Sequence, residues 1–264
     1  MKINTVAVIG TGFIGTVHVE SIRRTGVSVK GVLSGSAEST KRGAENLSVS
    51  TQYKSVQEIC SDKDVTVVHV TSPNALHYPQ VKELMAAGKH VICEKPLALT
   101  AKEGIDLVNL ADKTGLVNAT CFNTRFYPMV HEARSLVKSD LIGVPRYIKG
   151  HYHQDWLTLE TDWNWRLEAE QAGELRAVAD IGSHLIDQIG FVSGLEISEV
   201  MAELHTLVKT RQKPTGPVQT FTIDTSSKRE SVKMSSDDAA GVAIASRLTT
   251  EIRGTGQAIR NALN

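Results

Sequence analysis

Short apolar runs alternate with longer segments of helical periodicity over roughly the first 120 residues. The β-branched runs that predict strands are Thr5–Ile9, Val27–Leu33, Val65–Val70, His90–Cys93 and Val117–Phe122. Helix signals lie between them: Ser55 precedes an apolar segment, Gly88 ends the segment from Pro79, and Gly115 ends the segment from Ala101. Strands that alternate with helices predict a doubly wound parallel sheet, here a first domain over residues 1–122.

The pattern changes after Phe122. Helices are predicted at 128–138 and 182–193, with a loop rich in Trp and Asp before the second helix. Strands are predicted at 145–153, 199–208, 218–223 and 240–245, and the polar segments 211–217 and 225–238 are predicted loops. This order is of the α+β kind, so we predict a second domain over residues 123–264.

Composition narrows the function classes. The chain has 29 Lys and Arg against 29 Asp and Glu, a zero formal charge that gives no general electrostatic reason to bind nucleic acid or an anionic membrane. No apolar run approaches the ~18 residues that would span a bilayer, and the first residues lead straight into a strand pattern, which predicts a cytoplasmic protein. Cys60, Cys93 and Cys121 are far apart and form no C-x-x-C pair, so we expect buried thiols.

A G-x-G-x-x-G motif directly follows the first predicted strand and opens a helix. Its residues are Gly10, Thr11, Gly12, Phe13, Ile14 and Gly15. Gly10 permits the tight turn, Gly12 lets the backbone approach a pyrophosphate, and Gly15 allows close packing of helix on strand. The helix N-terminus attracts the anion. The motif predicts a dinucleotide site; the alternative is a glycine turn that binds no ligand.

The end of the second predicted strand bears on the choice between NAD and NADP. The residues that follow Leu33 are Ser34, Gly35 and Ser36. No carboxylate at this tip repels a 2′-phosphate, two hydroxyls can donate to one, and Lys41 and Arg42 are nearby, so we favour NADP. Two alternatives stay open: Glu38 turns back to bind a ribose, or both cofactors bind.

Two further positions carry candidate chemistry. Lys95 closely follows the strand predicted at His90–Cys93, so its ammonium lies at the carboxyl end of the sheet and is able to polarise a substrate oxygen. The alternative is that Lys95-Pro96 is only a solvated turn. Asp180 and His184 are spaced i and i+4 on one helix face, which is a plausible general acid/base arrangement. The alternatives are a helix N-cap for Asp180 and a core histidine for His184.

No metal site is assigned from the sequence. His151 and His153 offer two imidazoles at i and i+2 of a predicted strand, but no third ligand is nearby. A surface or packing pair is the simpler interpretation.

Four motifs occur in a fixed order. They are the glycine motif, the loop Thr71–His77, the segment Gly88–Pro96 with its Glu94-Lys95-Pro96, and Asp180-x-Gly182-x-His184-x-x-Asp187. Together they resemble the Gfo/Idh/MocA oxidoreductase family over roughly Val6 to Asp238. The resemblance implies an N-terminal Rossmann domain joined to an α/β domain with an open, mostly antiparallel sheet. It also implies an NAD(P)-dependent dehydrogenase or reductase of sugars, cyclitols and related polyols that assembles as a homodimer or homotetramer through the open sheet.

The same resemblance implies roles for individual residues. Lys95 would orient and polarise the substrate oxygen, His184 would exchange the proton with the reacting hydroxyl, and Asp180 would hold the substrate or tune His184. The cofactor contacts would be Gly10, Gly12, Phe13, Ile14, Gly15, Ser34, Gly35, Ser36, Ser72, Asn74, His77, Glu94, Lys95, Arg125, Trp165 and Arg166. The substrate contacts would be Lys95, Asp155, Trp163, Asp180 and His184.

The aromatic loop before the second predicted helix fits a carbohydrate site. Asp155-Trp156 and the segment Asp162–Arg166 combine indole faces, which stack on sugar C-H groups, with carboxylates and amides that accept hydroxyl protons. Packing between domains is the alternative. We expect only one of Trp163 and Trp165 to meet the substrate.

Relatives of this family are usually considerably longer, and the segment after Ala245 lacks the expected apolar, aromatic strand. These departures indicate a truncated or frameshifted product with an unfinished sheet edge, which is an aggregation hazard unless another subunit covers it. They keep a second function class open, a non-catalytic dinucleotide-binding sensor or an inactive dehydrogenase remnant.

Overall fold

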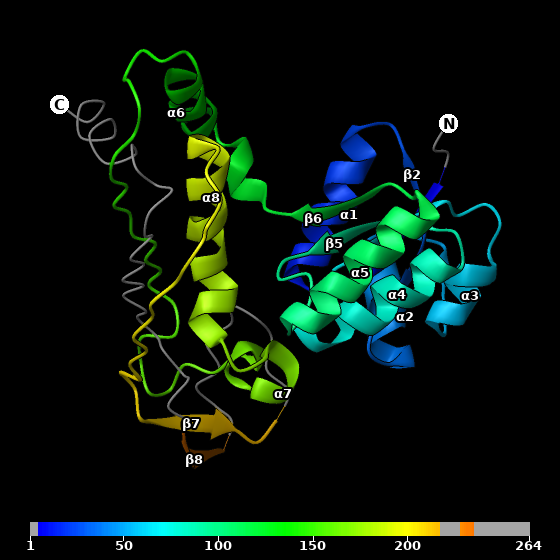
Figure 1. The fold of residues 1–264 in the computed structure, drawn as a ribbon. Coiled ribbons are helices and arrows are strands. Elements are labelled where there is room, and N and C mark those ends of the chain that lie inside the picture. Colours follow the sequence, from blue (N-terminus) through cyan, green and yellow to red (C-terminus); the bar gives the residue numbers. More distant parts are fainter. Residues whose placement is uncertain (1–4, 217–227, 235–264) are drawn as a thin grey trace. The chain divides into compact units, whose positions relative to one another are not determined.

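The computed structural model describes residues 5–216 and 228–234. The chain folds into two compact units (Figure 1). The first comprises Met1–Cys121 and Glu168–Gly173, and the second comprises Phe122–Leu167 and Glu174–Asn264. In these described ranges, none of the helices has the length and apolar character needed to cross a membrane. The segment Glu168–Gly173 lies beyond the predicted boundary at residue 122, yet it packs with the first unit.

The first unit is built on a six-stranded parallel sheet with the order β3-β2-β1-β4-β5-β6. Its strands are β1 (Thr5–Ile9), β2 (Ser28–Leu33), β3 (Thr51–Gln52), β4 (Val67–Val70), β5 (His90–Glu94) and β6 (Asn118–Cys121). The five strands predicted from the apolar runs are confirmed. The prediction missed β3, because a strand of two residues is too short to show a period-two pattern. From β1 the chain adds strands first on one side of the sheet (β2, β3) and then on the other (β4, β5, β6). Doubly wound folds bind their ligands at this switch point between β1 and β4.

Five α-helices connect the strands. They are α1 (Phe13–Arg24), α2 (Ala37–Asn46), α3 (Val56–Ser61), α4 (His77–Ala86) and α5 (Ala101–Thr114), and a short helix η1 (Asn74–Leu76) precedes α4. The expected cap at Ser55 is present, since its side chain accepts a hydrogen bond from the Glu58 amide. Gly115 ends α5 in the left-handed conformation, with φ of 64°.

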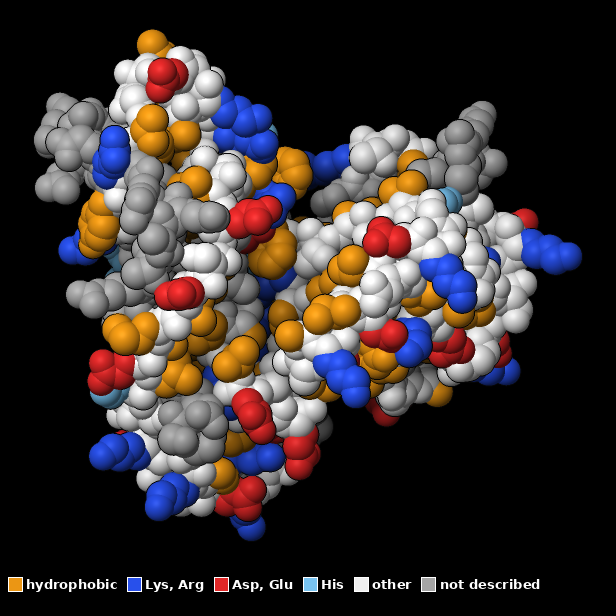
Figure 2. All heavy atoms as spheres, in the orientation of Figure 1, with side chains coloured by type: hydrophobic (Ala, Val, Ile, Leu, Met, Phe, Trp, Pro, Cys, Tyr) orange, Lys and Arg blue, Asp and Glu red, His pale blue; other side chains and the backbone are white. Residues whose placement is uncertain are grey.

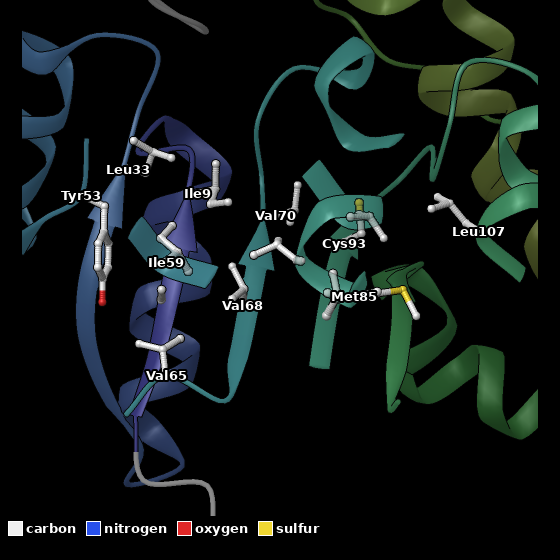
Figure 3. Packing of buried hydrophobic residues seen from close by; sticks show 14 residues of the cluster. Ile9, Leu33, Tyr53, Ile59, Val65, Val68, Val70, Met85, Cys93 and Leu107 are labelled. Carbon is white, nitrogen blue, oxygen red and sulfur yellow. The ribbon is translucent and has the colours of Figure 1, made fainter. Parts of the chain in front are cut away.

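Alternate residues of the strands face two apolar layers. Val6 and Val8 pack with residues of α1 and α2, whereas Ala7 and Ile9 pack with residues of α3, α4 and α5. Figure 3 shows the second layer, which follows one face of the sheet from Tyr53 past Ile9 and Val70 to Cys93. A sheet covered by helices on both faces holds the carboxyl ends of its strands in fixed positions.

The outer surface of α5 is partly apolar. Ile105 is 62% exposed and Val108 is 54% exposed. In Figure 2 hydrophobic side chains lie among charged ones on the face that α5 covers.

The second unit contains two helices that pack side by side, α6 (Pro128–Lys138) and α8 (Ser183–Ser193), and both were predicted (Figure 1). The short elements are η2 (Asn123–Phe126), η3 (Trp165–Leu167) and η4 (Val178–Gly182); α7 (Ala169–Ala172) belongs to the first unit. An antiparallel pair, β7 (Thr210–Pro214) and β8 (Arg229–Lys233), forms a small sheet.

The strand predictions for this unit need correction. The segments 145–153 and 199–208 form no regular strand, and the predicted strands 218–223 and 240–245 lie outside the described residues. Instead β7 lies in a segment predicted as a loop. Its buried Arg211 donates to the backbone oxygens of Leu157, Leu159 and Asp162. These hydrogen bonds stabilise a polar strand that carries no apolar alternation, which explains why the pattern missed it.

A polar cluster involving β2 and the turn after α3 gives a first testable expectation. The Asp62 carboxylate accepts hydrogen bonds from Lys30, the Tyr53 hydroxyl and the Asp64 amide, at 2.7–3.0 Å. Burial raises the pKa of Asp62, but these hydrogen bonds outweigh it and lower the pKa to about 2.

The ordinary value is 3.8, so the stabilisation is complete above about pH 4 and is lost as the pH falls towards 2. We expect it to amount to about 2 kcal/mol. Urea unfolding of the protein and of Asp62→Asn across this pH range measures it. A stability difference between the two proteins that stays constant from pH 7 to pH 2 would contradict this assignment.

Candidate functional site

The turn between β1 and α1 is held tightly against the end of β4. Gly10 has φ of +95°, and a Cβ atom there would lie 2.5 Å from the Thr71 carbonyl oxygen. A Cβ on Gly15 would lie 2.1 Å from the Gly10 carbonyl oxygen. The Thr71 hydroxyl donates to the carbonyl oxygens of Ile9 and Gly10, at 2.8 and 2.9 Å. Both glycines are therefore required by the fold itself.

Gly12 is different, because a Cβ atom there would meet nothing within 4 Å. It precedes α1 as the N-cap residue with extended dihedrals and no side-chain cap. The first amides of any helix lack intrahelical acceptors and carry the positive end of the helix dipole. This end of α1 is therefore open to an anionic ligand that approaches the backbone, as the motif predicts.

The tip of β2 places hydroxyl groups beside a second helix N-terminus. Ser36 caps α2 and forms a reciprocal pair with Ser39, and the Ser34 amide donates to the Thr40 hydroxyl at 2.9 Å. A Cβ on Gly35 would meet no atom within 4 Å. Glu38, which was considered as a ribose ligand, is largely exposed and lies 4.0 Å from Arg42.

Three predicted cofactor residues make hydrogen bonds within the first unit. Ser72 donates to Gln80 at 2.6 Å, and Asn74 donates to the Ala172 carbonyl at 3.1 Å, which attaches α7 to η1. His77 is only 1% exposed, and its two ring nitrogens lie 2.7 Å from the Pro96 oxygen and 2.8 Å from the Ser72 oxygen. His77 thus joins the segments that follow β4 and β5.

Lys95 is half-buried directly after β5, and Glu94 is the last residue of that strand. The Glu94 carboxylate accepts a hydrogen bond from the Lys95 amide at 3.2 Å and lies 3.1 Å from His18 Nε2. His18 in turn contacts His69, Nδ1 to Nδ1, at 2.8 Å. Burial lowers the pKa of His69 to about 4, so this ring is neutral at pH 7.

In the second unit Asp180 lies within a π-helical turn, η4, that leads into α8. It is therefore not the helix N-cap that was considered as an alternative. Its carboxylate accepts from Arg166 Nε at 3.0 Å, and the Arg166 guanidinium lies 4.5 Å from the Trp165 ring centroid. Single π turns inside helices occur frequently at functional sites.

His184 is the buried residue of α8. Its Nδ1 lies 3.4 Å from the hydroxyl of the buried Thr124, and its ring stacks on Tyr152 with centroids 5.8 Å apart. Phe122 meets it edge-on at 6.0 Å. These contacts fix the plane of the imidazole, as an acid/base group requires.

Arg125 and Asp187 join η2 to α8 through a two-pronged ion pair. The Arg125 Nε atom donates to Asp187 Oδ2 at 2.7 Å, and the second guanidinium nitrogen donates to Oδ1. Hydrogen bonding to Asp187 raises the pKa of the Arg125 guanidinium above its ordinary value. In the second unit Arg125, a predicted cofactor contact, orients the helix that carries His184.

The aromatic loop is ordered by polar contacts. Arg166 donates to the side-chain oxygen of the buried Asn164, and Lys213 lies 5.3 Å from the Trp163 ring centroid. Asp155 is exposed to solvent. His151 and His153 have ring centroids 4.9 Å apart. One face of Trp163 is thus close to a lysine ammonium.

Sequence reasoning did not single out Thr71, Thr124 or Asn164 as site residues. Each is buried and hydrogen-bonded to a predicted site residue or its immediate neighbour. These residues are hard to recognise in the sequence, because a threonine or asparagine that positions another side chain belongs to no motif with a fixed spacing. Only the fold shows which group it contacts.

Two family models match the chain. Residues 4–121 match the model described as "Oxidoreductase family, NAD-binding Rossmann fold", and residues 130–260 match the "GFO/IDH/MocA C-terminal domain".

Named relatives and solved structures agree with this match. A levoglucosan dehydrogenase of Pseudarthrobacter phenanthrenivorans is 34% identical over 61% of this chain and 41% of its own length. A myo-inositol 2-dehydrogenase of Thermotoga maritima is 28% identical over 83% of this chain and 63% of its own length. The solved structure of a levoglucosan dehydrogenase in complex with NADH has a TM-score of 0.75 and 30% identity, and the match covers 79% of this chain and 58% of that one. The chain thus spans about half the length of the curated relatives it matches.

Proposed function

Because the chain belongs to the Gfo/Idh/MocA oxidoreductase family, we propose that it is a nicotinamide-dependent dehydrogenase or reductase of a sugar, cyclitol or related polyol. The bound dinucleotide supplies or accepts the hydride at a carbon that carries a hydroxyl in one substrate form and a carbonyl in the other. One observation carries the proposal: the glycine turn after β1 and Lys95 after β5 both follow the carboxyl ends of strands in one parallel sheet. Doubly wound folds bind dinucleotides at that edge.

The proposed roles follow from the chemistry of each side chain. The Lys95 ammonium donates a hydrogen bond to the substrate oxygen and stabilises negative charge there. His184 takes the hydroxyl proton during oxidation and returns it during reduction, with its Nδ1 side near Thr124. Asp180, held by Arg166, binds a substrate hydroxyl or tunes His184. The proton that leaves the substrate is thus carried by the protein, and the hydride by the cofactor.

The proposed cofactor contacts are the glycine turn, the β2 tip, the loop after β4, and the residues Glu94, Lys95, Arg125, Trp165 and Arg166. The amides at the start of α1 suit a pyrophosphate, and the Gly12 backbone is open to it. For Ser72, Asn74 and His77, whose side chains bind other protein groups, we propose that the backbone lines the cofactor. The proposed substrate contacts are Lys95, Asp155, Trp163, Asp180 and His184.

We expect NADPH to bind more tightly than NADH. None of the residues Ser34, Gly35 and Ser36 carries a carboxylate that would repel a 2′-phosphate, and the N-terminus of α2 lies beside them. Ser34→Asp is expected to weaken NADPH binding at least about tenfold, or ~1.4 kcal/mol, and to leave NADH binding intact. Calorimetric titration with both dinucleotides measures this, and Ser34→Asn is the control of similar shape without charge. Tighter NADH binding by the unaltered protein would reverse the preference.

The experiment that tests the function is a panel of sugars, inositols and sugar acids assayed with both cofactors by absorbance of the reduced nicotinamide. Levoglucosan and myo-inositol belong in the panel because the named relatives act on them. Turnover of any member supports the proposal and excludes a purely non-catalytic sensor. Saturable dinucleotide binding without turnover across the panel would favour the sensor or remnant instead.

We also propose that the second unit mediates a homodimer or homotetramer. Within the described residues of this unit, several large apolar side chains are more than half exposed, among them Leu141, Val144, Tyr147, Val200, Met201 and Leu207. Apolar side chains exposed in such numbers favour a protein contact. Light scattering after size-exclusion chromatography at micromolar concentration measures the mass, and a monomer would contradict the proposal.

A further inference from the structure

One face of the first sheet gathers polar side chains from four different elements. His18 comes from α1, His69 from β4, Glu94 from the end of β5 and Cys121 from the end of β6. Val68 and Cys93 pack on the opposite face, and since side chains alternate along a strand, their neighbours His69 and Glu94 point to the α1 face. Glu94 and Cys121 are direct partners in the β5–β6 register, which brings the carboxylate and the thiol to the same face.

The potential ligand atoms are close together. One ligand atom each from His18, Glu94 and Cys121 lies within 4.8 Å of the other two. All three residues are partly buried, and the side chains of His18 and Glu94 are 11% and 14% exposed. Of the Lys, Arg and His side chains in the described ranges, only His18 lies within ion-pairing distance of the Glu94 carboxylate. A cation at this point would therefore meet a carboxylate that no lysine or arginine neutralises.

The spacing suits a tetrahedral ion. With metal–nitrogen and metal–oxygen bonds of about 2.0–2.1 Å, a tetrahedral site separates the two ligand atoms by about 3.3 Å. The observed separation of His18 Nε2 and Glu94 Oε1 is 3.1 Å. A metal–sulfur bond of about 2.3 Å places the thiolate about 3.6 Å from each of them. The Cys121 sulfur lies within 4.8 Å of both ligand atoms.

His69 supplies a partner for the remaining nitrogen of His18. A metal-binding histidine coordinates through one ring nitrogen and donates its other N–H to a nearby acceptor, which fixes the tautomer. His18 Nε2 faces Glu94, while its Nδ1 lies 2.8 Å from His69 Nδ1. The two rings meet edge-to-face, with centroids 5.1 Å apart. This arrangement leaves Nε2 as the coordinating atom.

We propose that His18, Glu94 and Cys121 bind a divalent transition-metal ion of the Zn²⁺ class, with water as the fourth ligand and His69 as the outer hydrogen-bond partner. Imidazole, thiolate and carboxylate together suit this borderline ion, whereas Mg²⁺ and Ca²⁺ prefer oxygen ligands. The thiol proton leaves to solvent when the ion binds. A second step rests on the proposed function: Glu94 is a proposed cofactor contact, so the ion weakens dinucleotide binding.

Cobalt(II) is the probe for the site, because a cobalt–thiolate bond gives a charge-transfer band in the near ultraviolet and tetrahedral cobalt gives strong visible bands. The full-length reduced protein, freed of metal, is titrated with Co²⁺, and Zn²⁺ is then added in competition. We expect one equivalent of Co²⁺ to produce both bands and Zn²⁺ to remove them. Cys121→Ser is expected to lose the charge-transfer band, and Cys60→Ser is the matched control that keeps it.

The outer partner gives a second, independent readout. His69→Ala is expected to weaken Co²⁺ binding by about 10–100-fold while the charge-transfer band persists at saturation. Circular dichroism of each variant tests that it is folded. A charge-transfer band that survives in Cys121→Ser, or the absence of saturable Co²⁺ binding by the folded unaltered protein, would overturn the metal site.

Titration of NADPH with and without one equivalent of Zn²⁺ tests the second step. We expect at least a tenfold loss of NADPH affinity in the presence of the ion, and unchanged affinity would overturn the link to the cofactor. If the protein binds no dinucleotide at all, the proposed function fails, while the cobalt spectra still decide whether the metal site exists.

Discussion

Replacing Lys95 with methionine is expected to lower turnover by about 10²–10⁴-fold and to lower dinucleotide affinity far less, because Lys95 is only one of many proposed cofactor contacts. Methionine keeps most of the length of the side chain but removes the ammonium that we propose to polarise the substrate oxygen. Lys95 follows β5 directly and is half-buried. Steady-state kinetics on the best substrate of the panel, together with calorimetric titration of the cofactor, measures the two effects separately.

The same comparison applies to His184→Gln, which keeps a polar side chain but removes the imidazole. We expect a turnover loss of similar order, because the residue is proposed to carry the proton. Lys102→Met is the control for a lysine-to-methionine change, since Lys102 is exposed on α5. If Lys95→Met and His184→Gln lose cofactor affinity as much as turnover, the assigned roles are wrong and both residues belong to binding.

The sequence predicts the first unit well because several signals agree there. The apolar runs of β1 and β4 are almost wholly buried, so their strand character is visible without any knowledge of their partners. The glycine turn is equally readable. Gly10 and Gly15 have no room for a Cβ atom, and that steric demand selects the residue type directly.

The second unit is less readable because its elements depend on distant partners. β7 shows no apolar alternation, and Arg211 stabilises it through contacts to a loop about 50 positions earlier in the chain. No local pattern reports such contacts. Spacing of i and i+4 correctly placed Asp180 and His184 in one continuous helical segment, but it could not predict the π turn at Val178–Gly182 or the pairing of Asp180 with Arg166.

His77 illustrates a limit of transferring roles from motifs. Its place after Asn74 predicts a cofactor contact, which stays a prediction, and in the fold its ring is buried between the Ser72 and Pro96 carbonyl oxygens. A residue that a motif assigns to a site can also stabilise the loops that form the site, as His77 does for the segments that follow β4 and β5. The cluster of His18, Glu94 and Cys121 is a possible site that no motif indicates. Its residues come from separate elements and meet only once the sheet is formed.

Replacing Gly12 with alanine is expected to leave the fold intact and to weaken dinucleotide binding at least about tenfold, or ~1.4 kcal/mol. The two effects separate because a Cβ atom at this position meets nothing within 4 Å and φ is −76°, which alanine adopts freely. The folding cost is then limited to the poorer helix cap, under about 1 kcal/mol. A bound pyrophosphate, by contrast, would lie against this backbone and would meet the added methyl group.

Urea unfolding and cofactor calorimetry on the same preparations test this separation. Gly104→Ala, inside α5, is the control. A Cβ there is also uncrowded, and the change is expected to stabilise the helix by about 0.5–1 kcal/mol without affecting the cofactor. Gly15→Ala gives the opposite extreme, since its Cβ would collide with the Gly10 backbone and should destabilise the whole unit. If Gly12→Ala keeps both stability and full dinucleotide affinity, then no pyrophosphate lies against this turn. The glycines of the turn would then serve the packing of the first unit and not the binding of a cofactor.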